Sequence, residues 1–376
     1  MPAVANIAWQ RLLRIAVVVT AISLVLFYLS QLYYSGPQQP AWKQSTHGGS
    51  GYKDQNITAQ PDQSPPRSSP QPYLPGTIPG IPGKVWQTAR DTNLTDEQRG
   101  WIGSWLEKNP SFRYELLTDD SSDTYVYERY NQTRPDIVSL YTSLPIAILR
   151  ADLLRYLILL ADGGIWSDLD VTCEKEVAGW LPAEFYGANS TAKVSLVVGL
   201  EFDMEWPGEG SGIASQLSNW VFAAAPGSRH LQHVVDEVVK GLYDIAKENN
   251  VRPENITLEM ISDVVDVTGP KKMTIGIVES LSQMLNRPVD DRHIARGKEP
   301  RLIGDVVVLP GNAFAAAQNG FPNDQGDKLV THHYAGSWKG PADAARESRR
   351  EKLEEERRKK EEEERRKKEE REKAQS

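Results

Sequence analysis

The sequence predicts an α/β domain with a mostly parallel sheet, placed between a membrane-spanning helix and a charged helical tail. Three observations predict this order. Residues 15–34 form an uncharged apolar run. From residue 81 onward, short apolar runs typical of strands alternate with longer stretches that have helical spacing. Residues 344–373 consist almost entirely of Glu, Lys and Arg.

Composition limits the class of protein. The 376 residues allow one large domain or two ordinary ones, and 39% hydrophobic with 25% charged residues is compatible with a sizeable core. These values exclude wholesale disorder and a multi-span membrane protein. A net charge of −8 argues against a nucleic-acid binder. The single cysteine, Cys173, excludes internal disulfides, thiolate-rich zinc sites and iron–sulfur clusters.

The first 80 residues predict a membrane anchor and a stem. Residues 15–34 are long enough for a helix that crosses roughly 30 Å of hydrocarbon, and Arg11 and Arg14 precede them. Residues 1–14 should therefore stay cytosolic, while the chain after the anchor crosses. A cleaved signal peptide is the alternative, but the run is long and no convincing cleavage site follows it. Residues 35–80, rich in Pro, Gln, Ser and Gly, are expected to form a flexible stem.

Glycosylation sequons favour a lumenal body. Five Asn-x-Ser/Thr sequons follow the predicted anchor, at Asn56, Asn93, Asn131, Asn189 and Asn255. With the anchor, they predict a single-pass type II protein of the Golgi membrane, whose folded domain at 81–340 is lumenal.

The folded domain is expected to begin with a strand at 81–86 and a helix at 96–109. Further strands are expected at 113–117, 165–171, 194–202 and 305–309, and helices at 145–162 and 230–247. The helix at 145–162 is apolar on nearly every side, so it should be buried, and Gly163 and Gly164 should end it. Residues 341–376 favour a solvated single helix, with a partner-binding arm as the alternative.

Acidic and basic side chains gather after the buried helix. Asp168 and Asp170 end a predicted strand, where residues two apart point the same way and can reach one cation. Mg²⁺ and Mn²⁺ prefer such oxygen ligands and usually bridge substrate phosphates. Two solvated turn carboxylates are the plainer alternative, but the carboxyl end of a buried strand is where α/β sheets bind ligands.

Two further features add to this candidate site. Asp152 and Arg155 share one helix face, either as an internal ion pair or as groups that hydrogen-bond a sugar or ribose. The segment THHYAGSW at 331–338 offers an imidazole that could complete a metal shell with the two aspartates.

With these residues in view, the chain resembles glycosyltransferase family 32, and within it the fungal initiation-specific α-1,6-mannosyltransferases. The resemblance extends over about 81–340 and rests on IPGKVWQT, LPIAILRADLLRYLILLADGGIWSDLDVTC, VVGLEFD, VTGP and HHYAGSWKG. It implies a Rossmann-like GT-A fold and a retaining transfer of mannose from GDP-mannose to an N-glycan core. It also implies a divalent metal; the imidazole favours Mn²⁺, with Mg²⁺ as the alternative.

The resemblance also assigns roles. It implies that Asp168 and Asp170 grip the metal and diphosphate as the catalytic pair. At most one of two adjacent histidines on an extended segment can face the aspartates, and the resemblance implies that His333 is the one that binds the metal. The resemblance also implies residues that bind the donor. Trp86 would stack on the base, Asp152 and Arg155 would hold the sugar, and Ser337 and Trp338 would lie against the diphosphate.

Three alternatives stay open. The chain could be a family 32 enzyme that mannosylates inositol phosphoceramide, although those usually carry extra C-terminal membrane spans. It could be a non-catalytic lumenal subunit of a mannosyltransferase complex, or a metal-dependent hydrolase with a carboxylate pair.

Overall fold

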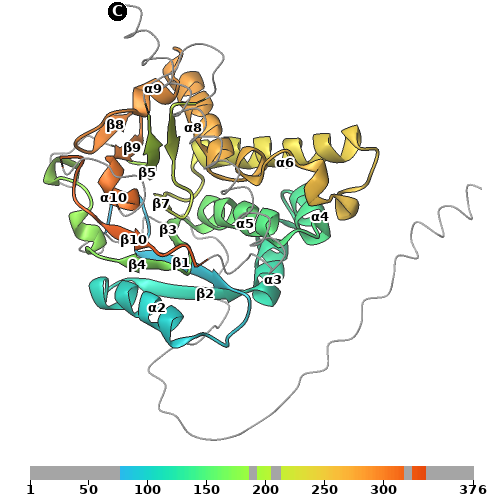
Figure 1. Cartoon of the computed structure of the whole chain (residues 1–376), viewed down its shortest axis with the longest axis horizontal. Coiled ribbons are helices and arrows are strands. Elements are labelled where there is room, and N and C mark those ends of the chain that lie inside the picture. Colours follow the sequence, from blue (N-terminus) through green and yellow to red (C-terminus); the bar gives the residue numbers. More distant parts are fainter. Residues whose placement is uncertain (1–76, 186–192, 205–212, 317–323, 336–376) are drawn as a thin grey trace, which may run out of the picture. The chain divides into compact units, whose positions relative to one another are not determined.

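The computed structural model describes residues 77–185, 193–204, 213–316 and 324–335 (Figure 1). The predicted cytosolic tip, the anchor, nearly all of the stem and the charged tail lie outside these ranges. Within these ranges, no helix combines the length and the apolar character needed to cross a membrane.

The described chain alternates strands and helices, as the sequence predicts. The strands are β1 (Lys84–Ala89), β2 (Arg113–Thr118), β3 (Gly164–Ser167), β4 (Val171–Cys173), β5 (Leu196–Asp203), β6 (Ser215–Leu217), β7 (Val221–Ala224), β8 (Arg301–Ile303), β9 (Val306–Leu309) and β10 (Val330–His332). The helices are α2 (Asp96–Lys108), α3 (Asp119–Tyr130), α4 (Pro135–Ser143), α5 (Ala147–Asp162), α6 (Arg229–Glu248), α7 (Val264–Val267), α8 (Pro270–Leu285), α9 (Asp291–Ile294) and α10 (Gly311–Ala315).

The main sheet is mixed, so the predicted mostly parallel sheet is wrong in this respect. Its strand order is β2-β1-β3-β7-β5-β9-β8, with β6 beside β5. β1 is parallel to β2 and β3, and β5 is parallel to β9, whereas the pairs that involve β6, β7 and β8 are antiparallel. These three strands have only three or four residues each, too few to give a clear alternating pattern in the sequence.

The sheet separates two hydrophobic cores. On β9, Val306 and Val308 pack with residues of α5, α6 and α8, while Val307 and Leu309 pack on the opposite face with Phe314 of α10. Successive side chains on a strand point to opposite faces, so an unbroken apolar run belongs to a sheet that is covered on both sides. Figure 1 shows α5, α6 and α8 together on one side of the strands.

Helix α5 begins two residues after the predicted start and ends at Asp162, where it was expected to end. The next two residues must both be glycine. Gly163 and Gly164 have φ values of 65° and 104°, and a Cβ on Gly164 would lie 2.6 Å from the carbonyl oxygen of Lys84. This tight turn places β3 directly beside β1 at the centre of the sheet.

The predicted strand at 165–171 is in fact two strands with a turn between them. β3 ends at Ser167, Asp168–Asp170 form the turn, and β4 begins at Val171. β4 leaves the main sheet and pairs antiparallel with β10, with His332 opposite Val171. The two aspartates are therefore held in a turn at the sheet edge and do not continue the strand.

Candidate functional site

The turn that carries the two aspartates lies where β1 and β3 end side by side. Gln87, at the buried end of β1, donates from Nε2 to the carbonyl oxygen of Asp168 at 3.0 Å and to Ser167 Oγ at 3.2 Å. The backbone N–H of Asp168 donates to the carbonyl oxygen of Trp220 at 2.7 Å. Because buried hydrogen bonds fix the turn from both sides, its carboxylates project from a rigid base.

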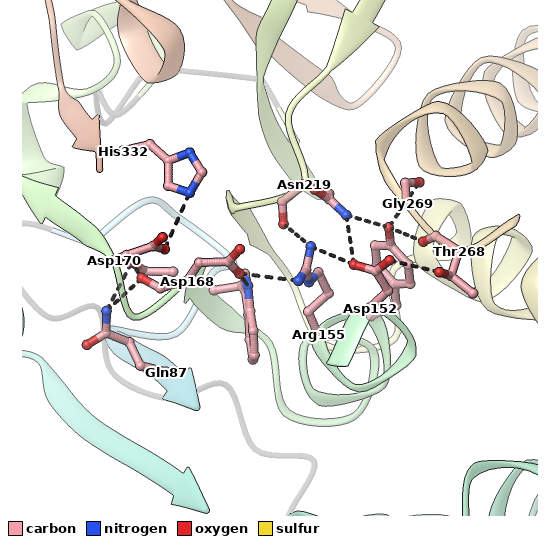
Figure 2. A network of polar contacts seen from close by, with 12 residues as sticks. Gln87, Asp152, Arg155, Asp168, Asp170, Asn219, Thr268, Gly269 and His332 are labelled. Atoms are coloured by element: carbon pink, nitrogen blue, oxygen red, sulfur yellow. Dashed lines mark hydrogen bonds and ion pairs between the residues drawn. The ribbon is translucent and has the colours of Figure 1, made fainter. Parts of the chain in front are cut away.

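Asp168, Asp170 and His332 form a candidate metal centre. One ligand atom from each lies within 4.8 Å of the others, and in the described part of the chain no other group of three metal-ligating side chains comes so close together. Figure 2 shows the His332 ring pointing at Asp170, and its Nε2 lies 3.3 Å from Asp170 Oδ1. Two carboxylates and an imidazole suit Mn²⁺ or a similar divalent ion, so this donor set fits the metal that the sequence implies.

The assignment of His333 as the third metal ligand is wrong in this geometry. The His333 backbone N–H donates to the carbonyl oxygen of Asp170 at 2.9 Å. Its ring turns to the other side, where it stacks on Trp101 with ring centroids 5.1 Å apart, and its Nε2 lies 2.6 Å from Thr172 Oγ1. The expectation that only one of the two histidines can face the aspartates is confirmed. The pairing of β10 with β4 makes that residue His332.

The environments of the two aspartates shift their pKa values in opposite directions. Burial raises the pKa of Asp168, although neighbouring Arg155 opposes the rise. Burial also acts on Asp170, but hydrogen bonds from His332 and from the Ala335 backbone outweigh it and lower the pKa of that carboxyl. Asp170 is therefore the more readily ionised partner, and a bound cation would favour the charged form of both.

Arg155 connects the aspartate turn to the buried helix. Its Nη1 lies 3.0 Å from Asp152 Oδ1, and its Nη2 lies 3.4 Å from Asp168 Oδ1 (Figure 2). Asp152 also accepts hydrogen bonds from Asn219 at 3.2 Å and from Thr268 at 2.8 Å. Asp152 is only 3% exposed. The internal ion pair is therefore confirmed, and Asp152 holds Arg155 in place.

Trp86 does not occupy the position predicted for it. Its side chain is 1% exposed, and its Nε1 donates to the carbonyl oxygen of Gly163 at 3.0 Å. The ring packs edge-on against Tyr125, with Lys84 over its other side. A ring enclosed in this way cannot stack on a nucleotide base. Trp86 packs against Tyr125 of α3 on one face of β1, and the next residue, Gln87, lies on the other face and reaches the site instead.

Ser337 and Trp338, assigned to the diphosphate, lie outside the described residues. Conversely, Gln87, Asn219 and Thr268 support the site and were not predicted from the sequence. Each is an uncharged polar side chain that is at most 5% exposed. Gln87 directly follows Val85 and Trp86, and an amide beside such apolar residues in a strand is the one signal that could have indicated a supporting role.

The comparisons with known proteins agree with this geometry. A family model described as "Glycosyltransferase sugar-binding region containing DXD motif" matches residues 95–186, which include the aspartate turn. Residues 95–186 are therefore similar to this glycosyltransferase family. The matched segment runs from α2 through α5 to β4 and so contains Arg155 with both aspartates.

Relatives extend the likeness beyond that segment. An "Initiation-specific alpha-1,6-mannosyltransferase" of Schizosaccharomyces pombe is 31% identical over 266 residues, which cover 69% of this chain and 64% of the relative. The match therefore spans somewhat less than two thirds of that protein. An "Inositol phosphoceramide mannosyltransferase 3" of the same organism is 35% identical over 95 residues, or 25% of this chain. Among solved structures, the "PaToxG Glycosyltransferase" is 15% identical, with a TM-score of 0.34, over 55% of this chain and 73% of that one.

Proposed function

We propose that this protein is a retaining, metal-dependent mannosyltransferase with a GT-A fold. It transfers mannose from GDP-mannose to an N-glycan core in an α-1,6 linkage. The observation that carries the proposal is the cluster of Asp168, Asp170 and His332 at the carboxyl edge of the sheet. The long match to an α-1,6-mannosyltransferase supports the choice of sugar and linkage.

The residues of the cluster suit a diphosphate leaving group. Asp168, Asp170 and His332 would hold a divalent ion, which would supply positive charge where the departing diphosphate gains negative charge. Trp166 Nε1 donates to Asp168 Oδ1 at 2.7 Å, and the backbone N–H of Ala335 donates to Asp170 Oδ2 at 2.8 Å. These bonds fix both carboxylates before the donor binds, so little reorganisation is needed during the reaction.

Arg155 adds a second fixed positive charge behind Asp168. It is buried, and Asp152 compensates part of its charge. In the proposed reaction, the bond from the anomeric carbon to the diphosphate breaks as the acceptor hydroxyl attacks from the same face. A phosphate oxygen of the leaving group takes the hydroxyl proton. Attack on the face from which the diphosphate departs gives retention without a covalent enzyme intermediate.

The direct test is transfer by the purified full chain, supplied with GDP-mannose, other GDP- and UDP-sugars, and a mannose-terminated N-glycan. We expect mannose to be transferred from GDP-mannose only, in a reaction that EDTA stops and Mn²⁺ restores, with Mg²⁺ as the weaker substitute. NMR of the product should show an α-1,6 bond. Transfer from a UDP-sugar in place of GDP-mannose would contradict the proposed donor, and full activity in EDTA would contradict the metal.

A second candidate function is mannosylation of inositol phosphoceramide, because a relative named for that activity is 35% identical to this chain over 95 residues. That match covers only a quarter of this chain, so the N-glycan acceptor is the better supported. Presenting the glycan and the ceramide acceptor to the same preparation separates the two functions.

The proposed compartment rests on the sequence. The apolar run at 15–34 and the sequons support a type II protein of the Golgi membrane, where subunits of a mannosyltransferase complex are its possible partners. Glycosidase sensitivity at Asn93 and Asn131 in cells would support a lumenal domain, whereas unmodified sequons together with cytosolic protease access would contradict it.

A further inference from the structure

A second strand ends at the same sheet edge as the aspartate turn. β7 is antiparallel both to β3 and to β5, so β3 and β5 run in the same direction. Their registers also agree, because Gly164 and Leu196 both pair with Ala224. Five residues further along each strand are Leu169, inside the aspartate turn, and Glu201. Along the strand direction, Glu201 therefore lies at about the same height as the aspartate turn. Across the sheet, it is two strand spacings away, or about 10 Å.

Glu201 is the extra residue of a β-bulge. Leu200 pairs with Leu217 and Phe202 with Gln216, so β5 advances by two residues where β6 advances by one. A bulge redirects the side chain of its extra residue and often lies beside a functional site. Gln216, which is buried, donates from Nε2 to Glu201 Oε2 at 2.7 Å and holds the carboxylate in one orientation.

Tyr334 packs against two aromatic rings at this sheet edge. Its ring centroid lies 4.0 Å from that of His332 and 6.1 Å from that of Trp220, whose own ring stacks on His332. Trp220 immediately precedes β7, which lies between β3 and β5 and runs antiparallel to both, so Tyr334 lies at the sheet edge shared by the aspartate turn and Glu201. Tyr334 nevertheless remains 54% exposed.

The backbone of Tyr334 is held in an unfavourable conformation. Its φ of 51° lies in the left-handed region, which bulky residues rarely adopt. Asp170 fixes it there from both sides, because its carbonyl oxygen accepts from the His333 N–H and its carboxylate accepts from the Ala335 N–H. Strain of this kind persists only where surrounding contacts enforce it, and it gathers at functional sites. Here it presents a large exposed ring beside the candidate metal ligands.

We propose that Tyr334 and Glu201 form a subsite for a neutral hexose ring, seated on the exposed tyrosine ring with its hydroxyl groups at the carboxylate. An aromatic face suits the C–H side of a sugar, and a fixed carboxylate accepts hydrogen bonds from hydroxyl groups. The proposal rests on the proposed function. Two sugars have this chemistry, the terminal mannose of the acceptor and the mannosyl group of the donor, and the experiment separates them.

The test compares the KM and kcat of four variants of the full chain with those of the parent. Tyr334→Gly removes the ring and keeps the left-handed backbone, whereas Tyr334→Phe keeps the ring. Glu201→Gln keeps the shape of the side chain and removes its charge. Tyr127→Ala, at a tyrosine that is 51% exposed on α3, is the matched control for loss of a surface ring.

We expect Tyr334→Gly and Glu201→Gln each to raise one KM about tenfold, the size of losing about 1.4 kcal/mol of binding. Tyr334→Phe and Tyr127→Ala should stay within about twofold of the parent. A rise confined to the acceptor KM identifies the acceptor mannose. A rise in the KM for GDP-mannose, with unchanged Kd for GDP, identifies the donor mannosyl group.

The proposal is overturned if neither KM changes in Tyr334→Gly and Glu201→Gln, or if Tyr334→Phe is as impaired as Tyr334→Gly. Should Tyr334→Gly fail to fold, Tyr334→Asn carries the same test, because asparagine tolerates the left-handed region. Saturation-transfer NMR with mannobiose, without donor, measures hexose binding directly. If the parent chain binds mannobiose and transfers no mannose, the proposed function fails, while loss of that binding in Tyr334→Gly still supports the subsite.

Discussion

Replacing His332 and His333 one at a time tests the register that places the candidate metal ligands. His332→Ala removes one of three donor atoms that lie within 4.8 Å of one another. Loss of a residue that only supports a metal ligand typically weakens metal binding about 10- to 100-fold, so loss of a direct ligand should cost at least about 100-fold. His333→Ala removes a stacking contact with Trp101 and a contact to Thr172, neither of which is a donor to the cluster.

The assay should report on the metal without relying on transfer. Electron paramagnetic resonance of free Mn²⁺, titrated with the purified chain and GDP, gives a Kd for each variant. We expect His332→Ala to raise that Kd at least about 100-fold and His333→Ala to change it less than about threefold, since the latter loses no ligand. Near-ultraviolet circular dichroism of the tryptophans checks that both variants are folded.

The opposite ranking would refute the reasoning. A large loss in His333→Ala with little change in His332→Ala would mean that β10 pairs with β4 one residue out of the described register. A one-residue slip turns every side chain of a strand to the other face. Equal and small effects would remove histidine from the metal centre altogether.

Three other changes test the support around the site. Arg155→Met leaves Asp152 buried without its ionic partner, so the free energy of unfolding should fall by about 3–5 kcal/mol. Denaturant unfolding that shows no loss would contradict the buried pair. Trp86→Phe leaves the buried carbonyl oxygen of Gly163 without its donor, so the free energy of unfolding should fall by about 1–3 kcal/mol while the Kd for GDP stays unchanged. Weaker GDP binding, measured by calorimetry, would support stacking of Trp86 on the base. Burial opposes ionisation of Asp305, but a hydrogen bond with His230 outweighs burial and lowers the pKa of Asp305 below the ordinary 3.8. Ionised Asp305 therefore stabilises the fold above pH 3.8, and this stabilisation is lost as the pH falls through the lower pKa of the folded state. Asp305→Asn should therefore lower the melting temperature at pH 6 and reduce its fall between pH 5 and 3. An unchanged fall over that pH range would show that the Asp305–His230 pair does not stabilise the fold.

The long elements could be predicted from local sequence alone. Helix α5 carries an apolar pattern along its whole length and ends at two glycines, so its existence and its end needed no tertiary information. The same holds for α6 and for the runs that became β2, β5 and β9. Local spacing also placed Asp152 beside Arg155, because residues three apart on a helix share a face.

Short strands and side-chain directions could not be predicted in this way. β7 has four residues, yet it sets the relation between β3 and β5 and so makes the sheet mixed. The strand expected at 165–171 breaks at the aspartates because β4 finds a partner, β10, that lies far away in sequence. Pairing between segments so far apart produces no recognisable pattern in the local sequence of either one.

For the site, the sequence determined which chemistry is present, and the tertiary structure decided which side chains take part. Asp168, Asp170, Arg155 and a histidine pair were evident from residue type and spacing. The choice of His332 over His333 depends on the register of two strands, and the contact of Trp86 with Tyr125 depends on which face of β1 meets α3. Both are two-fold choices, since a strand alternates its faces, and only the packing of distant segments settles them.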